Sequence, residues 1–537
     1  MTQHLAAALS PSAHRDTFCR DNLPPLDQWP VLDLGPLDYA DRLNCATELL
    51  DGTIGRFGPE RPCLRSPDET AWTYGELRAH ANRIAAVLVD DLGLVPGNRV
   101  LLRGFNEPWL VACWFAVLKA GGVAVTTMPL LRAGELATMA EMFRPTIALC
   151  DHRLTDDLQA AAVPDLTTVP FGSAAPDDLC ARAAGKAAEF PDVDTSADDV
   201  ALLAFTSGTT GRPKATMHFH RDVLAIADTF SAHVLRPEPG DVFAGSPPIG
   251  FTFGLGGLVV FPLRVGASVL LLERATPDVL ADAVARHGVT VLFTAPTAYK
   301  AILAAGHADR LAGIRRAVSA GEALPASVWR DVHEATGLRI IDGIGATEML
   351  HIFIAAADDD IRPGSTGRAV PGYTAAVLDD DGRPAPDGTP GHLAVRGPTG
   401  CRYLGGDRQG VYVQGGWNVT GDTYLRDADG YFHFQARTDD MIVSAGYNIA
   451  GPEVEQALLG HPDVVDCAVV GAPDPERGMI VKAFVVLNPE RTRDVPAGEL
   501  QDFVKQAIAP YKRPRAVEFL DELPRTSTGK LQRYKLR

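Results

Sequence analysis

Strand-like and helix-like segments alternate along most of this 537-residue chain. Short apolar runs at 99–102 and 289–293 predict strands, and the segments that follow them, 109–119 and 297–305, repeat apolar residues at helical intervals. Alternation of this kind favours βαβ units around largely parallel sheets, so we expect an α/β fold. Further strands are expected at 122–125, 200–205, 269–272, 315–318 and 338–341, and further helices at 77–88, 277–287 and 325–336.

The composition changes after about residue 364, where Gly, Pro and Asp become frequent and short strands such as 392–395 lie between turns. Asp379-Asp380-Asp381-Gly382 is interpreted as a hairpin turn, because an Asp-Asp-Gly turn is far commoner than a metal site. This part of the chain is therefore expected to form a β-rich subdomain over about 365–438.

A last unit begins at about residue 439. Helices are expected at 452–459 and 497–509, with strands at 464–470 and 480–487. The pattern predicts a small, mobile α+β C-terminal domain over 439–537, which follows a large N-terminal domain over 1–438.

Composition excludes several classes of function. The net charge of −17 argues against a general nucleic-acid surface. The eight cysteines form no CxxC pair, so we expect buried free thiols in the cytoplasm. The apolar window 254–272 is broken by Pro262, Arg264 and Gly266, which favours strands and turns over a membrane span. The N-terminus lacks the features of a signal peptide. The oligomeric state is expected to be a monomer or a homodimer.

A loop rich in Gly and Thr follows the apolar run 200–205, which is expected to form a buried strand. Its glycines let backbone N–H groups converge on an anion, its hydroxyls donate further bonds, and its cations offset phosphate charge. A Walker A loop is excluded, because Pro213 precedes Lys214 where that motif requires a Gly-Lys-Ser/Thr run that opens a helix. The loop reads Thr206-Ser207-Gly208-Thr209-Thr210-Gly211-Arg212-Pro213-Lys214.

This loop resembles the phosphate loop of the adenylate-forming superfamily, the acyl-CoA and aryl-CoA ligases. Further motifs extend the resemblance in the expected order over almost the whole chain, at Ser319–Pro325, Asp342–Glu348, Trp417–Asp422 and Pro524–Lys530. The resemblance implies an enzyme that uses ATP, Mg²⁺ and CoA. It also implies two half-reactions, adenylation of a carboxylate and transfer of the acyl group to a thiol.

The resemblance assigns roles to individual positions. Thr347 would bind phosphate, Glu348 would hold Mg²⁺, and Asp422 would accept hydrogen bonds from the ribose hydroxyls, supported by Arg437. With Lys530, Thr347 and Glu348 are the expected catalytic residues. The expected ATP- and AMP-binding residues are Thr206, Ser207, Gly208, Thr209, Thr210, Gly211, Lys214, Gly321, Glu322, Asp342, Gly343, Thr347, Asp422 and Arg437.

Movement of the C-terminal domain is implied by the same resemblance. Lys530 would enter the site for adenylation and then leave, because a point charge suits a group that bridges carboxylate and α-phosphate. Asp439 is the expected hinge. Gly446 and Tyr447 would line the passage for the pantetheine arm of CoA.

The substrate is expected to be an aromatic carboxylic acid. Phe253 should face the acyl carbonyl, and the segment 347–353 resembles benzoate-CoA ligases, with His351 in the aryl pocket. The segments 16–25 and 217–222 look most like 2-aminobenzoate (anthranilate)-CoA ligases. The expected aryl-pocket residues are Thr252, Phe253, Ala320, Ile344, Gly345 and His351.

The acceptor of the acyl group stays open at this stage. The acyl group could instead pass to the phosphopantetheine arm of a carrier protein, since both acceptors share the same tunnel chemistry. His218 and His220 invite comparison with a metal site, but they stand at alternate positions of an expected strand with no third ligand near them in the sequence.

Overall fold

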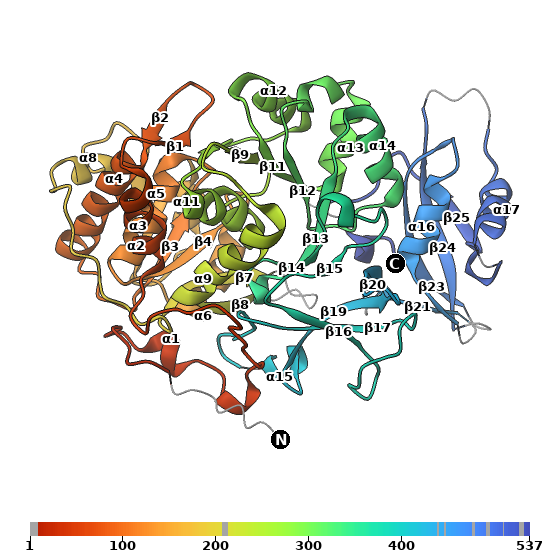
Figure 1. Ribbon diagram of the computed structural model, residues 1–537, viewed down its shortest axis with the longest axis horizontal. Helices are drawn as coiled ribbons and strands as arrows, with labels where there is room; N and C mark the ends of the chain where they lie inside the picture. Colours follow the sequence, from red (N-terminus) through yellow and green to blue (C-terminus); the bar gives the residue numbers. More distant parts are fainter. Residues whose placement is uncertain are drawn as a thin grey trace.

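The structure is a computed structural model that describes residues 9–206, 213–406, 408–437, 440–444, 447–474, 478–489, 494–508, 510–525 and 531–537. The strands of these residues form four sheets. Figure 1 shows the first sheet and its helices at the left, helices α12 to α14 at the upper centre, a β-rich layer below, and the C-terminal unit at the right. The predicted fold class, a large α/β domain with a β-rich part and a small α+β unit, is confirmed.

The first sheet has six strands in the order β6-β5-β3-β4-β7-β8. All neighbours are parallel except the last pair, in which β7 and β8 form an antiparallel hairpin. The expected phosphate loop therefore connects two strands and does not open a helix. The strands are β3 Arg99–Arg103, β4 Val123–Thr127, β5 Ile147–Asp151, β6 Thr167–Phe171, β7 Val200–Thr206 and β8 Lys214–Phe219.

The second sheet has nine strands in the order β15-β14-β13-β12-β11-β9-β10-β1-β2. Neighbouring strands from β13 to β1 in this order are parallel. The pairs β15-β14 and β14-β13 at one end and β1-β2 at the other end are antiparallel. The strands are β1 Pro62–Arg65, β2 Ala71–Thr73, β9 Val242–Gly245, β10 Ser268–Leu270, β11 Val291–Thr294, β12 Arg316–Ser319, β13 Ile340–Gly345, β14 Ile352–Ala355 and β15 Arg368–Ala369.

Helices cover both sheets close to where the periodicity predicts them. Helix α5, Pro108–Lys119, is buried along almost its whole length and packs against α4, Tyr74–Ala86. Helix α12 spans Pro277–His287 as predicted, followed by α13, Pro296–Ala304, and α14, Ala326–Thr336.

The prediction of strands and turns in the apolar window 254–272 is wrong for most of its length. Helix α10, Thr252–Leu255, continues through a π-helical segment into α11, Phe261–Val265. Pro262 lies where the π-helical segment passes into α11 and the helical hydrogen-bond pattern changes, and Gly266, at φ 73°, ends the helix. None of the helices in the described ranges is long and apolar enough to cross a membrane.

The β-rich layer contains a third sheet, and the predicted turn lies inside it. The Asp379 side chain accepts hydrogen bonds from the N–H groups of Asp381 and Arg383, at 3.0 and 2.8 Å. The turn prediction is therefore confirmed. The strands are β16 Thr374–Leu378, β17 Gly391–Arg396, β18 Val413–Gln414, β19 Trp417–Arg426 and β20 Phe432–Arg437.

The C-terminal unit has its own apolar core, which includes Val454 and Leu458 of α16 and Leu500 and Val504 of α17. Its elements are β21 Ile442–Ser444, β22 Tyr447–Ile449, α16 Gly451–Leu459, β23 Val464–Asp474, β24 Gly478–Leu487, α17 Ala497–Ala507 and β25 Ala516–Phe519. The expected domain boundary at 438/439 falls on residues outside the described ranges and stays a prediction.

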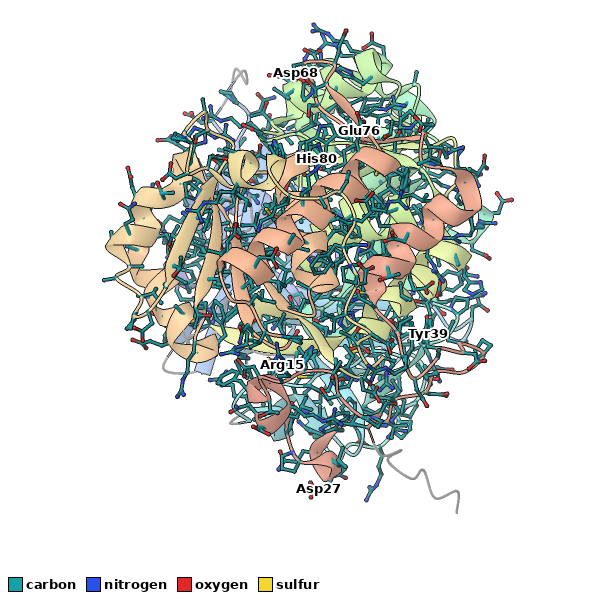
Figure 2. The ribbon with its side chains drawn as sticks, turned by 90° about the vertical axis from the view of Figure 1, so that its left-hand side faces the viewer. Arg15, Asp27, Tyr39, Asp68, Glu76 and His80 are labelled. Carbon is teal, nitrogen blue, oxygen red and sulfur yellow. The ribbon has the colours of Figure 1, made fainter. Side chains whose placement is uncertain are left out.

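A segment near the N-terminus, residues 28–33, runs along the β-rich layer, and we call it the N-terminal strap. The N–H of Val31 donates to the Gly416 carbonyl at 2.8 Å, and the N–H of Asp33 donates to the Gly397 carbonyl at 3.0 Å. In Figure 2, Asp27, just before the strap, lies at the lower end of the molecule, below Arg15 and Tyr39. The strap therefore ties the start of the chain to the third sheet.

Helix α4 begins with a capping box, in which Thr73 and Glu76 each accept from the other's N–H, at 3.1 and 2.7 Å. We expect Thr73→Ala to destabilise the large domain by about 1 kcal/mol, because one N–H of the first turn loses its acceptor. The shift in the urea midpoint measures this loss. Thr389→Ala, at an exposed turn position, is the matched control. Equal midpoints for the two variants would contradict the prediction.

Candidate active site

A large open cleft of about 2990 Å³ lies where the two α/β sheets, the third sheet and the C-terminal unit meet. The carboxyl ends of β12 and β13 open into it, as expected for ligand sites in parallel sheets. Residues predicted from separate motifs line this one cleft: Thr206, Lys214, Thr252, Phe253, Ala320, Gly321, Glu322, Asp342, Gly343, Ile344, Gly345, Thr347, Glu348, His351, Asp422 and Arg437.

Some predicted positions lie outside the described residues. These are Ser207, Gly208, Thr209, Thr210 and Gly211 of the loop, the hinge Asp439, the tunnel residue Gly446, and Lys530. Tyr447 lies on β22, but its side chain is not described. Their roles stay predictions.

The turn between β13 and β14 carries the two residues expected at the phosphates. Thr347–Met349 form one 3₁₀ turn, and Leu350 follows at φ 68°, a conformation that costs a non-glycine residue on the order of 1–3 kcal/mol. Glu348 is only 8% exposed, and the Tyr403 hydroxyl donates to its carboxylate. Such a conformation persists only where surrounding contacts fix it, so the turn is held firmly.

Positive charge gathers opposite Glu348. Lys214 stands at the start of β8, paired with Thr206 at the end of β7, and its Nζ lies 5.6 Å from the centre of the Tyr403 ring. Burial, and then the charge of Arg408, lower the pKa of Lys214, while Glu348 opposes the shift. Two cations close to one carboxylate suit a triphosphate with a bound metal ion.

Glu348 fits a magnesium ion by its chemistry. A carboxylate oxygen beside the Thr347 hydroxyl offers the hard ligands that Mg²⁺ prefers, and Mg²⁺ is usually held by one or two carboxylates together with substrate phosphates. Within the described part of the chain, no group of three or more His, Cys, Asp or Glu side chains could hold a metal by itself. A metal bound here would therefore depend on the nucleotide for most of its ligands.

The ribose motif forms a pair across two strands. Asp422 on β19 faces Arg437 on β20, and Arg437 Nη1 donates to Asp422 Oδ1 at 2.9 Å. Both side chains line the cleft. The guanidinium orients the Asp422 carboxylate, which is expected to accept hydrogen bonds from two ribose hydroxyls.

Four expected ATP-binding residues lie at β12 and β13: Gly321 and Glu322 follow β12, and Asp342 and Gly343 lie on β13. Asp342 and Gly343 were expected after the strand, but β13 runs through them to Gly345, because this half of β13 pairs with the returning strand β14. Burial raises the pKa of Asp342 well above its usual value, which favours a neutral carboxyl that can donate a hydrogen bond.

Aromatic rings enclose the expected aryl pocket. The ring of His351 lies 5.8 Å from Phe253 and 4.5 Å from Phe261, between centroids, and Phe293 lies 5.4 Å from Phe253. His351 is 3% exposed, and burial lowers its pKa to about 3, so the ring is neutral. A Cβ on Gly256 would collide with this ring, so glycine is needed there.

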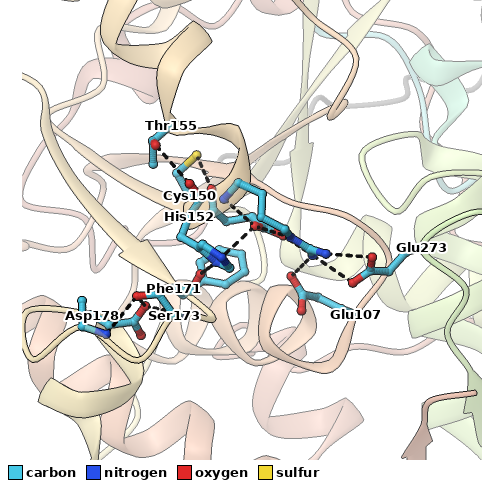
Figure 3. Close-up of polar contacts among 11 residues, drawn as sticks. Glu107, Cys150, His152, Thr155, Phe171, Ser173, Asp178 and Glu273 are labelled. Carbon is cyan, nitrogen blue, oxygen red and sulfur yellow. Dashed lines mark hydrogen bonds and ion pairs between the residues drawn. The ribbon is translucent and has the colours of Figure 1, made fainter. Parts of the chain in front are cut away.

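An ionic cluster on another wall of the cleft joins the two α/β sheets (Figure 3). Arg153 Nη2 lies 2.6 Å from Asp151 Oδ2 at the end of β5, and 2.8 Å from Glu273 Oε1 after β10. Its distance to Glu107 Oε1 is 3.7 Å, and burial first, then hydrogen bonding to Asp151, raises the pKa of Glu107 to about 8. No sequence motif predicts this cluster. Its ion pairs hold this wall of the cleft in place.

Sequence motifs missed several residues of the site. Tyr403, Arg408 and Tyr412 line the cleft, and Phe261 and Phe293 form the second layer of the aryl pocket. Tyr403 and Arg408 lie in an irregular segment, Tyr412 ends the short helix α15, Gln409–Tyr412, and the two phenylalanines lie inside apolar elements. In these places the residue types carry no signal of ligand contact.

Comparison with known proteins gives two family matches. The AMP-binding enzyme family matches residues 53–403, and the AMP-binding enzyme C-terminal domain matches residues 453–530. The benzoate–CoA ligase of Thauera aromatica is 35% identical over 520 residues, which cover 93% of this chain and 96% of that protein. The 4-hydroxybenzoate–CoA/benzoate–CoA ligase of Rhodopseudomonas palustris is 33% identical and covers 92% and 94%.

Solved structures agree with this relationship. The anthranilate CoA ligase AuaEII in complex with anthranoyl-AMP has a TM-score of 0.88 at 33% identity, and the match covers 93% of this chain and 98% of that one. A benzoate CoA ligase from Burkholderia xenovorans LB400 has a TM-score of 0.83 at 31% identity, over 92% and 100%. The chain therefore belongs to the AMP-binding enzyme family and is an acid–thiol ligase of its CoA-ligase branch.

Proposed function

We propose that this enzyme is an AMP-forming aryl-CoA ligase that activates a small aromatic carboxylic acid, with 2-aminobenzoate or a benzoate-type acid as the preferred substrate. The observation that carries the proposal is the aromatic pocket of Phe253 and His351, in the same cleft as Thr347 and Glu348. Benzoate and anthranilate ligases among the relatives support it.

In the first half-reaction, a carboxylate oxygen of the acid attacks the α-phosphorus of ATP. The bond to the bridging oxygen breaks, and pyrophosphate leaves with that electron pair. Lys214 and Arg408 offset phosphate charge from one side, and Lys530 supplies charge at the α-phosphate. When Mg²⁺ is bound at Glu348, it neutralises charge on the phosphate oxygens.

In the second half-reaction, the CoA thiol loses its proton and its sulfur attacks the acyl carbonyl. The bond between the acyl carbon and the phosphate oxygen then breaks, and AMP leaves. We propose that the C-terminal domain turns about Asp439 between the two steps, which withdraws Lys530 and presents Gly446 and Tyr447 to the pantetheine arm. Domain closure of this kind commonly separates steps that need different surroundings.

A panel of acids tests the substrate class. Benzoate, 2-aminobenzoate, salicylate and cinnamate are compared with octanoate, and CoA-dependent release of AMP is measured. We expect the first two acids to give the highest kcat/KM. A preference for octanoate would contradict an aryl pocket, and no AMP release with any acid would contradict the function.

His351 is the polar group of the pocket wall that could distinguish ring substituents. Both ring nitrogens are buried and make no well-aligned hydrogen bond within the described residues, so an ortho amino group packed against the ring would supply the missing partner. We expect His351→Leu to reduce kcat/KM for 2-aminobenzoate about tenfold more than for benzoate, because a hydrogen bond is lost with one acid only. His333→Leu, which removes an imidazole stacked on Trp329 away from the cleft, is the control. Equal losses for both acids would contradict this role.

The acceptor is tested separately. Free CoA is compared with a phosphopantetheinylated carrier protein at equal thiol concentration, in the presence of the preferred acid. Faster transfer to CoA is expected, and faster transfer to the carrier would favour a role in loading carrier proteins.

A further inference from the structure

A buried histidine lies directly beneath the turn that carries Thr347 and Glu348. His218 on β8 is 0% exposed, and its Nε2 lies 2.8 Å from the carbonyl oxygen of Thr347. A carbonyl oxygen only accepts, so Nε2 must carry the proton. Burial lowers the pKa of His218 to about 4, so the ring is neutral and Nδ1 is unprotonated.

The tautomer of His218 agrees with its surroundings. Nδ1 lies 3.9 Å from Oδ2 of Asp222, too far for a hydrogen bond, and Asp222 is paired with the fully buried Arg402. The same Asp222 oxygen accepts from the N–H of Phe219 at 2.9 Å. Asp222 Oδ2 is therefore engaged by Phe219 and Arg402, and His218 donates to Thr347.

Arg402 connects this buried group to two other parts of the molecule. Its guanidinium lies 3.9 Å from the centre of the Phe219 ring and 5.3 Å from that of Trp29 in the N-terminal strap. Its neighbour Tyr403 donates to Glu348. Because the Arg402 carbonyl accepts from the N–H of Met217 at 2.8 Å, this segment is fixed against β8.

A second side chain holds the far end of the same turn. Thr399 Oγ1 donates to the carbonyl oxygen of Met349 at 2.8 Å and lies 3.0 Å from the Tyr373 hydroxyl. The carbonyls of Thr347 and Met349 are thus both held from below by buried side chains of other elements. The carboxylate of Glu348, between them, points to Tyr403 and the cleft.

We propose that His218 is a positioning residue for adenylation. It holds the Thr347 carbonyl so that the Thr347 hydroxyl and the Glu348 carboxylate face the triphosphate and its metal ion. This inference rests on the function proposed above for Thr347 and Glu348. His218 does not touch substrate, and a role as a metal ligand is excluded because Nε2 is occupied by the carbonyl and Nδ1 lies in a fully buried site.

The test compares three variants. His218→Leu removes the donor, and His218→Gln keeps an N–H donor at about the same reach. His220→Leu is the matched control, because His220 is equally buried, stands two positions along and contacts Cys45 away from the turn. Each variant is assayed for ATP–pyrophosphate exchange over a range of Mg²⁺ concentrations, for thioester formation from supplied aryl-adenylate, and for thermal stability.

We expect His218→Leu to lower the adenylation rate, and to raise the Mg²⁺ concentration needed for half the maximal rate, by about 10- to 100-fold, as typical for residues that orient a metal ligand. Thioester formation from supplied aryl-adenylate should change by less than about threefold, since that step needs no pyrophosphate site. His218→Gln should recover most of the loss. An unchanged Mg²⁺ requirement, or equal loss of both half-reactions, would overturn the proposal.

Thr399→Val keeps the inference testable if His218→Leu does not fold. It removes the second tether with little change of shape, and it should raise the Mg²⁺ requirement in the same direction. Glu348→Gln separates the two hypotheses. If Glu348→Gln adenylates normally, the function proposed for the turn is wrong; if it is impaired while His218→Leu and Thr399→Val are normal, only the positioning role is wrong.

Discussion

Lys530→Ala should abolish adenylation yet leave the second half-reaction intact. Lys530 ends the motif Pro524–Lys530, and in the proposed function it supplies the charge that bridges the carboxylate and the α-phosphate in the first step only. Loss of one preorganised charged donor lowers a rate by about 10²- to 10³-fold, so exchange of pyrophosphate into ATP should fall at least that far. Conversion of supplied aryl-adenylate and CoA to thioester should continue near the wild-type rate.

A neighbouring lysine provides the control. Lys535 is exposed in the last turn of the same C-terminal tail, so Lys535→Ala removes one positive charge without touching the cleft. It should leave both half-reactions unchanged. Equal loss of the two half-reactions in Lys530→Ala would contradict the assignment of Lys530 to the first step.

Glu348→Gln should produce the second-largest loss. The amide keeps an oxygen that accepts from Tyr403, so the turn stays in place while the charge is removed. We expect the Mg²⁺ concentration for half-maximal pyrophosphate exchange to rise about 10- to 100-fold, because a neutral amide is a weak ligand for a hard cation. The rate at saturating Mg²⁺ should also fall.

Pyrophosphate exchange against Mg²⁺ concentration measures both effects. Glu334→Gln, at an exposed position on α14, makes the same chemical change away from the cleft and should behave as wild type. If Glu348→Gln had an unchanged Mg²⁺ requirement, the metal would have to bind elsewhere.

The spacing of apolar residues correctly predicted those helices that bury only one face. Helix α12 begins and ends as predicted because Leu280 and Val284 recur on its buried face and Thr276 caps its first turn. The prediction for the segment from Thr252 to Val265 was wrong because this segment is apolar on all sides and shows no period. Pro262 was interpreted as a break but lies inside the continuous helix, and Gly266 marks only its end.

Motif order predicted the residues of the cleft, because parallel strands bring their carboxyl ends to one edge. It could not predict how the site is supported. The contacts of His218 with Thr347 and of Tyr403 with Glu348 depend on how β8 lies against residues 401–404, far along the chain. No periodicity or composition encodes that juxtaposition.

The position of β1 in the second sheet has a consequence for synthesis. Leu64 on β1 pairs with Val269 on β10, and every strand of the first sheet lies between them in the sequence. As the chain leaves the ribosome, the edge of β1 that pairs with β10 stays unpaired until β10 has been synthesised. We therefore expect the two sheets to fold together and not one after the other. If the chain were split at Gly240, between the sheets, β1 and β2 would remain on the N-terminal fragment and β10 on the C-terminal fragment.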